Sequence, residues 1–446
     1  MVVLDNLIVA STLPAIQRSL GASLESLEWV LDAYILAFGV LMISAAAVGE
    51  RYGRRKVFIA GIVLFTVSSA AGAVAPNVET LILARAIEGI GGAIITPLTL
   101  TLLTSAFAVE HRSKALGAWS AIAGVGVAAG PVVGGILTDA LSWHWIFWVN
   151  VPVGIAIAVL APRVLVESRG RHERLDLGGL LLASTGLFAL IFATIRANAL
   201  GWGSAQTLAS YATGLVLLGA FLRWESRSTH AMVPLRFFSS REFSGANAAN
   251  FLLSFTMFSA FVMLVQFFSS VHGDGPIAVG VHSLFWTAMP MIVSPWGASF
   301  GRERGPARVA TLGMGLITAG MLSFALLVDP SAGVLTVAPA LVAIGTGIGL
   351  VLPNVVAIAL GAVPGEDVGK ASAVLNTARQ IGAATGVAVG VAIFQAAGGL
   401  GPVQAANGIR AALLVSAGAA AIGTLMTAVA QRGRAAEVAL AATASA

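Results

Sequence analysis

The sequence predicts an all-α protein that crosses a membrane many times, and three observations carry this prediction. Hydrophobic residues make up 57% of the 446 residues and charged residues only 10%, whereas ordinary soluble domains contain about 25% charged residues. Apolar runs of about 20 residues, the length that crosses a bilayer, recur along the whole chain. Basic residues gather in short turns between these runs. A soluble protein with a single hydrophobic core does not require this pattern.

Fourteen segments are long and apolar enough to cross a bilayer, and we predict a helix for each. The first segment contains Asp5 close to its start and Pro14 in its interior, so this helix is either truncated or begins upstream of Met1. The predicted ranges are 1–20, 28–48, 57–75, 80–107, 115–138, 144–165, 175–195, 205–223, 243–268, 276–299, 308–328, 334–360, 370–396 and 407–430.

The basic residues predict the orientation, because Lys and Arg concentrate in cytoplasmic turns. Twenty of the 25 Lys and Arg residues fall after even-numbered helices or in the C-terminal tail, whereas three fall in turns after odd-numbered helices. The turn after the second helix is the most basic, with Arg51, Arg54, Arg55 and Lys56. We therefore predict that both termini are cytoplasmic.

The longest predicted cytoplasmic linkers, Val166–Asp176 and Arg223–Phe243, bracket the seventh and eighth helices. This spacing indicates two six-helix bundles that face each other across a central path. The predicted organisation is an N-terminal bundle at 1–165, a two-helix insert with its linkers at 166–242, a C-terminal bundle at 243–430 and a cytoplasmic tail at 431–446.

Several functional classes are excluded by what the sequence lacks. Basic residues recur in turns rather than on one face, so nucleic-acid binding is not expected. The chain has no cysteine, and its six histidines show no metal-binding spacing. It also has no GxSxG nucleophile motif, no P-loop and no soluble segment long enough for a signalling domain. We expect no enzyme, no cofactor, no metal, no ATP-driven pump and no receptor.

The segment 80–107 carries Arg85 and Glu88 inside an apolar run. Helical spacing places both on one stripe with Gly89 and Gly92. Each charge at membrane depth costs about 2.5–3.5 kcal/mol, whereas each Leu or Ile returns only about 0.3–0.6 kcal/mol, so the stripe must face protein or water. Ionisable groups at this depth indicate a functional site. The alternative is a purely structural Arg–Glu pair.

Asp5 and Asp32 are two further carboxylates inside apolar segments. No Lys or Arg lies within one helical turn of Asp32 in the sequence. A carboxylate at this depth can exchange a proton, which a proton-coupled transport cycle requires. Alternatively, Asp32 lies hydrated at the outer interface, and Asp5 is a fixed counter-ion of Arg85. Our candidates for proton coupling are Asp5, Asp32, Arg85 and Glu88.

Two other helices contain residues of interest. The segment 115–138 carries glycines at helical spacing, which let another helix approach closely, and a proline that bends the helix. These residues are Gly126, Gly130, Pro131, Gly134 and Gly135. The segment 370–396 carries Asn376, Arg379 and Gln380 on one face. For Arg379, a structural clamp and a contact with the substrate both remain open.

Seven stretches together resemble the major facilitator superfamily, and specifically its fourteen-helix drug–proton antiporter branch. Their order and spacing over nearly the whole chain carry the resemblance. The stretches are LDNLIVASTLP (Leu4–Pro14), GERYGRR (Gly49–Arg55), RAIEGIGGA (Arg85–Ala93), GVAAGPVVGG (Gly126–Gly135), WHWIFWVNVPVG (Trp143–Gly154), PLRFFSSREFSGAN (Pro234–Asn247) and NTARQIG (Asn376–Gly382).

The chain departs from the pattern of this branch at three positions. Glu50 replaces the usual Asp of the loop motif, and Ala46 replaces its usual Gly. Glu88 stands where Gln is more frequent, so it adds a carboxylate beside Arg85. This third departure indicates altered handling of protons or cations.

The resemblance implies the major-facilitator fold and transport by alternating access. It also implies a cytoplasmic latch and a hinge in the fifth helix. The latch comprises Gly49, Glu50, Arg51, Gly53, Arg54 and Arg55, and the hinge comprises Gly130, Pro131 and Gly134. The expected function is multidrug efflux from a bacterium, in which a monomer in the inner membrane exchanges amphiphilic or cationic molecules for protons. The alternative is a dedicated exporter of an endogenous metabolite, such as an antibiotic or siderophore.

Overall fold

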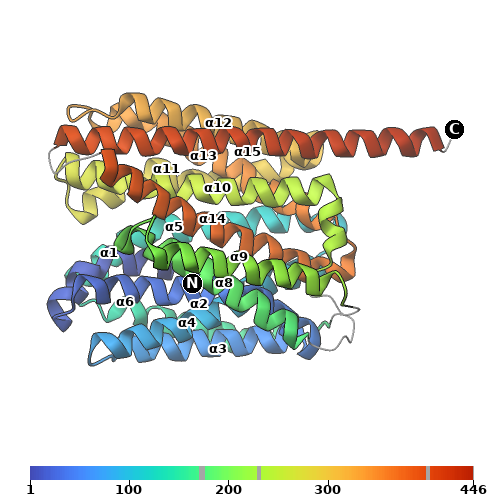
Figure 1. The fold of residues 1–446 in the computed structure, drawn as a ribbon, viewed down its shortest axis with the longest axis horizontal. Coiled ribbons are helices and arrows are strands. Elements are labelled where there is room, and N and C mark those ends of the chain that lie inside the picture. The colour runs from blue at the N-terminus through green and yellow to red at the C-terminus, as the bar shows by residue number, and fades with distance from the viewer. Residues whose placement is uncertain (170–175, 229–232, 398–401, 445–446) are drawn as a thin grey trace. The chain divides into compact units, whose positions relative to one another are not determined.

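The computed structural model describes residues 1–169, 176–228, 233–397 and 402–444, and these residues form helices without any strand (Figure 1). Each predicted range lies on helical structure, and the range 144–165 is divided between two helices. The helices of the first half are α1 (Val2–Leu20), α2 (Leu24–Tyr52), α3 (Arg54–Ala73), α4 (Val78–Ala106), α5 (Val109–Ala140), α6 (Trp145–Trp148), α7 (Asn150–Val164), α8 (Leu177–Leu200) and α9 (Ala205–Glu225).

The second half contains six long helices and three short ones. The long helices are α10 (Arg241–Gln266), α11 (Pro276–Arg304), α12 (Pro306–Leu327), α13 (Val334–Gly361), α14 (Val368–Ala397) and α15 (Pro402–Ala444). The short ones are the 3-10 helix η1 (Leu235–Ser239), the π-helix η2 (Phe267–Val271) and the 3-10 helix η3 (Gly365–Asp367).

The described residues contain ten helices that are long and apolar enough to cross a membrane, and an eleventh span if the two parts of the bent α2 count as one. The protein is therefore a multi-pass membrane protein. The total of fourteen spans stays a prediction. One boundary differs clearly from its prediction, because α15 continues to Ala444 instead of ending near residue 430. Alanine has the highest helix propensity, and the alanine-rich sequence after Arg434 favours this extension.

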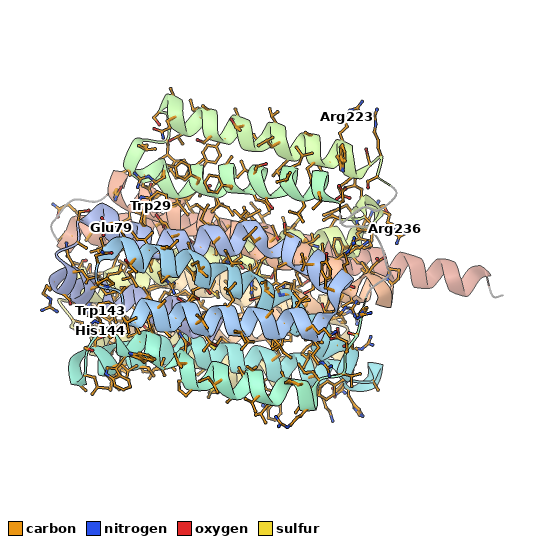
Figure 2. All side chains as sticks on the ribbon, turned by 90° about the horizontal axis from the view of Figure 1, so that it is seen from below. Trp29, Glu79, Trp143, His144, Arg223 and Arg236 are labelled. Carbon is orange, nitrogen blue, oxygen red and sulfur yellow. The ribbon has the colours of Figure 1, made fainter. Side chains whose placement is uncertain are left out.

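Contacts between Cα atoms divide the chain into two compact units. Unit 1 comprises Met1–Ala106, Gly126–Val233 and Pro276–Val281. In this unit α4 packs against α2 and α3, α3 packs against α7, and α8 packs against α2 and α9. The helices of the predicted insert therefore contact the N-terminal helices. Figure 2 shows Trp143 and His144 at one end of this unit and Arg223 at the opposite end.

Unit 2 comprises Phe107–Val125, Pro234–Gly275 and His282–Ala446. In this unit α10 packs against α14 and α15, and α12 packs against α13 and α15. The boundary between the units falls inside α5, and the predicted division at 165, 242 and 430 stays a prediction.

Local sequence accounts for several helix ends. Ser23, Asp176, Ser204 and Ser240 each cap a helix, because their side chains accept a hydrogen bond from a backbone N–H of the first turn. Gly53 separates α2 from α3 with a φ of 112°, a conformation that favours glycine. These caps fix where the four helices begin.

Gly89 sets the distance between α4 and α2. A Cβ atom at this position would lie 2.5 Å from the carbonyl oxygen of Tyr34 and 3.1 Å from its Cα atom. Both atoms belong to the backbone of α2, which cannot move aside as a flexible side chain does. The absence of a side chain at Gly89 therefore brings the preceding turn of α4, which carries Arg85, close to α2.

We expect Gly89→Ala to destabilise the protein by about 1–3 kcal/mol, because the added methyl group forces α4 away from α2. The measurement is thermal unfolding of the purified protein in detergent. Gly219→Ala in α9 is the matched control, since nothing lies within 4 Å of a Cβ atom there. Equal unfolding temperatures for the two variants would contradict the close approach.

Candidate functional site

A charge cluster lies buried in unit 1, where α1 meets α4. Arg85 and Glu88 are 0% exposed and Asp5 is 1% exposed. Nη1 of Arg85 donates to Oδ2 of Asp5 at 2.5 Å and to Oε2 of Glu88 at 2.7 Å. Two carboxylates thus share one nitrogen of a single guanidinium group.

Neighbouring helices complete the shell around this cluster. Nδ2 of Asn150, at the start of α7, donates to Oδ1 of Asp5 at 2.9 Å and to Oγ of Ser69 at 3.2 Å. Nε of Arg85 donates to the carbonyl oxygen of Val30 at 3.3 Å. Residues from α1, α2, α3, α4 and α7 therefore hold the three charged groups in fixed positions.

Part of the hydrogen-bonding capacity of the cluster remains unused. Nη2 of Arg85, Oε1 of Glu88 and the hydroxyl of Tyr34 are buried and make no hydrogen bond with a described residue. The guanidinium carbon of Arg85 lies 4.2 Å from the centre of the Tyr34 ring, a distance at which the ring stabilises a cation. With both carboxylates ionised, the three groups carry one net negative charge. The uptake of one proton by a carboxylate would therefore make the cluster neutral.

The four residues selected for proton coupling are not all together. Asp5, Arg85 and Glu88 meet in the cluster, whereas Asp32 lies half-buried on α2 and takes part in none of the contacts that define it. Sequence reasoning missed Asn150, although the stretch Trp143–Gly154 was singled out. An amide inside an apolar span was the signal that could have found it.

The basic turn after α2 contains a second set of ionic contacts. Arg54 and Glu50 form a buried two-pronged pair, in which Nε donates to Oε1 at 3.0 Å and Nη2 donates to Oε2 at 2.8 Å. Gly49 and Gly53 are buried beside this pair, whereas Arg51 is exposed. The turn therefore has a buried ion pair on its inner side and an exposed arginine on its outer side.

Glu167, which follows α7, binds the start of α3. Its carboxylate accepts hydrogen bonds from the backbone N–H groups of Arg55 at 3.0 Å and Lys56 at 3.2 Å. Nη1 of Arg55 in turn donates to the carbonyl oxygen of Leu165 at 3.0 Å. A carboxylate at a helix N-terminus satisfies free N–H groups and interacts favourably with the helix dipole. Sequence reasoning missed Glu167 because it lies more than 100 residues after α3 begins.

The glycine-rich stretch of α5 is helical throughout. Gly130, Gly134 and Gly135 are buried, and Gly126 is partly exposed. The side chain of Pro131 lies outside the described residues, so its predicted bend stays a prediction.

The polar residues of α14 differ in their contacts. Nδ2 of Asn376 donates to the carbonyl oxygen of Ser372 at 2.9 Å, within its own helix. Arg379 and Gln380 are half-buried. Neither side chain makes a hydrogen bond or an ion pair with any residue in the described part of the chain. The structural clamp and the substrate contact considered for Arg379 both stay predictions.

A comparison with known families decides what this architecture belongs to. The family model described as Major Facilitator Superfamily matches residues 1–387. The chain belongs to the Major Facilitator Superfamily. The resemblance seen in the seven sequence stretches is thereby confirmed, and the cluster, the basic turn and α5 are parts of a member of this transporter superfamily.

Curated members of the superfamily are similar over most of their length. The tetracenomycin C resistance and export protein of Streptomyces glaucescens is 32% identical over 391 residues, which cover 87% of this chain and 72% of that protein. The multidrug resistance protein Stp of Mycobacterium tuberculosis is 35% identical over 393 residues, with the same coverage of 87% and 72%. The cephamycin export protein CmcT of Amycolatopsis lactamdurans is 34% identical over 402 residues, which cover 87% and 81%.

A solved structure shares the fold. The crystal structure of the human organic anion transporter MFSD10 matches with a TM-score of 0.67 at 14% identity, and the match covers 96% of each chain. At this identity the likeness concerns the fold alone.

We expect Arg85→Gln to reduce the yield of folded protein sharply, because it leaves two buried carboxylates without their cation. Removing one partner of a buried ion pair costs about 3–5 kcal/mol. The triple variant Asp5→Asn, Arg85→Gln, Glu88→Gln removes all three charges and should recover most of the folded protein. The measurement is yield and monodispersity by size-exclusion chromatography. A single variant that folds as well as the triple variant would show that the pairing does not stabilise unit 1.

We expect Glu167→Ala to destabilise the protein by about 1 kcal/mol, since the first N–H groups of α3 lose their acceptor. Glu167→Gln keeps one acceptor oxygen and should fall between this variant and the wild type. The control is Glu79→Ala, which removes an exposed carboxylate from the first turn of α4. If thermal unfolding in detergent gives the same midpoint for Glu79→Ala and Glu167→Ala, Glu167 does not hold the start of α3.

Proposed function

We propose that this chain is a proton-coupled exporter of amphiphilic or cationic small molecules, acting as a multidrug efflux antiporter. Two of its relatives are named as export proteins, for tetracenomycin C and cephamycin, and a third as a multidrug resistance protein. Export against a gradient needs an energy source. A proton gradient supplies it where a membrane protein carries ionisable groups that alternately bind and release protons.

The cluster of Asp5, Arg85 and Glu88 is the observation that carries this proposal. It places two carboxylates on one permanent cation in a site that is at most 1% exposed. Glu88 is the better candidate for proton uptake, because its Oε1 accepts no hydrogen bond from any described residue, whereas both oxygens of Asp5 accept one. Asp5 then acts mainly as the fixed counter-ion of Arg85, and Asp32 is a separate proton site on α2.

The proposed architecture is two six-helix bundles with a two-helix insert, which together give fourteen spans. Both termini lie in the cytoplasm of a bacterium, and the protein resides in the inner membrane, as the bacterial relatives and the basic turns favour. We propose that the protein works as a monomer and exposes a central site alternately to the two sides of the membrane.

The two conformations of this cycle need a latch and a hinge. We propose that the Glu50–Arg54 pair and the contacts of Arg55 with Glu167 hold the cytoplasmic ends of α2, α3 and α7 together in one conformation. The stretch with Gly130, Pro131 and Gly134 would let α5 change its curvature as the bundles move.

A second candidate function is the export of a metabolite that the cell itself makes. The names of the tetracenomycin C and cephamycin export proteins favour this alternative. A narrow range of competing substrates would distinguish it from multidrug efflux.

We expect Glu88→Gln and Asp32→Asn each to lower substrate-driven proton flux in proteoliposomes at least tenfold, because an amide cannot carry the proton that a carboxylate exchanges. The measurement is an internal pH dye after addition of a transported drug. The drug is chosen beforehand from a susceptibility panel in an efflux-deficient host, with and without a protonophore.

The control for this experiment is Asp329→Asn, between α12 and α13. Hydrogen bonds from the hydroxyl and backbone N–H of Ser331 lower the pKa of Asp329, so this carboxylate stays ionised throughout the assay. Its variant should keep wild-type flux. Undiminished flux in Glu88→Gln would remove Glu88 from the coupling mechanism, and the same holds for Asp32→Asn and Asp32.

A further inference from the structure

Arg379 places a permanent positive charge inside a membrane-spanning helix. It lies eleven residues after Val368, the first residue of α14, which corresponds to about 16 Å along the helix axis. The segment Val368–Ala396 is long and apolar enough to cross a membrane, so Arg379 lies inside a candidate span. A cation inside such a span is strongly unfavourable unless another group compensates it.

Three other buried or partly buried arginines are compensated by the groups around them. Arg85 binds two carboxylates, Arg54 binds Glu50 at 2.8 Å, and Arg410 donates to two carbonyl oxygens at the end of α12. Arg379 makes no comparable contact with any residue in the described ranges. Since a guanidinium group keeps its charge in proteins, Arg379 cannot become neutral by releasing a proton.

The position of Arg379 follows from how α14 meets α10. A Cβ atom at Gly382 or Gly386 would collide with the carbonyl oxygens of Phe251 and Phe255, respectively. Both helices therefore advance by four residues between these two contacts, so they run in the same direction with a constant offset. The two glycines let the helix backbones touch over this length.

This register puts Arg379 at a polar level of unit 2. Arg379 precedes Gly382 by about one turn on the same stripe, and Asn247 precedes Phe251 by one turn on α10. Asn247 is 7% exposed, and its Oδ1 makes no hydrogen bond with a described residue. An uncompensated donor group and an unused buried acceptor thus occur at the same depth of one helix pair.

We propose that Arg379 binds an anionic group of the transported compound, such as a carboxylate, phenolate or phosphate. Five N–H donors in a planar fork suit such a group, and the anion supplies the charge that no described residue supplies. Asn247 offers an acceptor to a hydroxyl or amine donor on the same compound. Among the amphiphilic substrates of the proposed exporter, this site therefore selects those that carry an acidic group, including zwitterions. That the bound anion is cargo rests on the proposed export function.

Binding is tested separately from transport with a matched pair of probes. These are a rhodamine dye with a free carboxylate and the methyl ester of the same dye, which differ only in the anionic group. We expect the purified wild-type protein to bind the carboxylate dye about tenfold more tightly than the ester, because only the carboxylate forms charge-assisted hydrogen bonds with a guanidinium group. The measurement is fluorescence anisotropy in detergent.

The variants then assign this preference to one side chain. Arg379→Gln should reduce the carboxylate preference to less than twofold while leaving the affinity for the ester unchanged, which also shows that the variant is folded. Arg379→Lys keeps the charge but loses the fork, and it should retain part of the preference. Arg223→Gln removes one positive charge from the exposed end of α9 and should behave as wild type.

Two results would overturn the assignment. One is equal affinity of the wild type for the two dyes, or no binding of the carboxylate dye, which needs no variant to interpret. The other is a carboxylate preference that survives in Arg379→Gln. Export of both dyes from everted membrane vesicles is measured in parallel. Selective binding without proton-driven export would contradict the proposed function and support the anion site. Export of both dyes without carboxylate selectivity would support the proposed function and contradict the anion site.

Discussion

The ion pair between Arg85 and its two carboxylates is the constraint on which unit 1 depends. A guanidinium group that is 0% exposed must be compensated where it lies, so Asp5 and Glu88 have to be held within about 3 Å of it. Several other features follow from this requirement. Gly89 admits α4 to α2, and Asn150 fixes the second oxygen of Asp5.

The cluster combines two properties that are usually separated in a protein core. Its hydrogen bonds fix the geometry of five helices, yet Oε1 of Glu88 and Nη2 of Arg85 find no hydrogen-bond partner among the residues that the structure describes. A fully satisfied network would resist any change of charge, whereas this one can accommodate a proton. Unit 2 has the complementary arrangement, because Arg379 lies on a helix pair whose described residues give it no carboxylate. Proton and substrate would then be bound by different units through charges of opposite sign.

The basic turn after α2 shows how distant parts of the chain are joined. Glu167 comes from the linker after α7 but serves as the cap of α3, and Arg55 reaches back to the end of α7. Both contacts use partly exposed groups, so water can replace them when the helix ends separate. Contacts of this kind suit a connection that must open and close repeatedly during transport.

The sequence by itself determined the helical class, the positions of the apolar segments and the family. These follow from hydropathy over about 20 residues and from motifs of neighbouring residues, both of which are local properties. It also selected Asp5, Arg85 and Glu88, since charge inside an apolar run is visible without a structure. Only the tertiary structure decided that Asp5 meets Arg85 and that Asn150 binds Asp5. It also decided that Glu167 binds the start of α3 and that Arg379 lacks a described partner. Such contacts link residues about 80 to 145 positions apart, as Arg85 with Asp5 and Asn150 with Asp5 show. They depend on how helices pack, which no local pattern specifies.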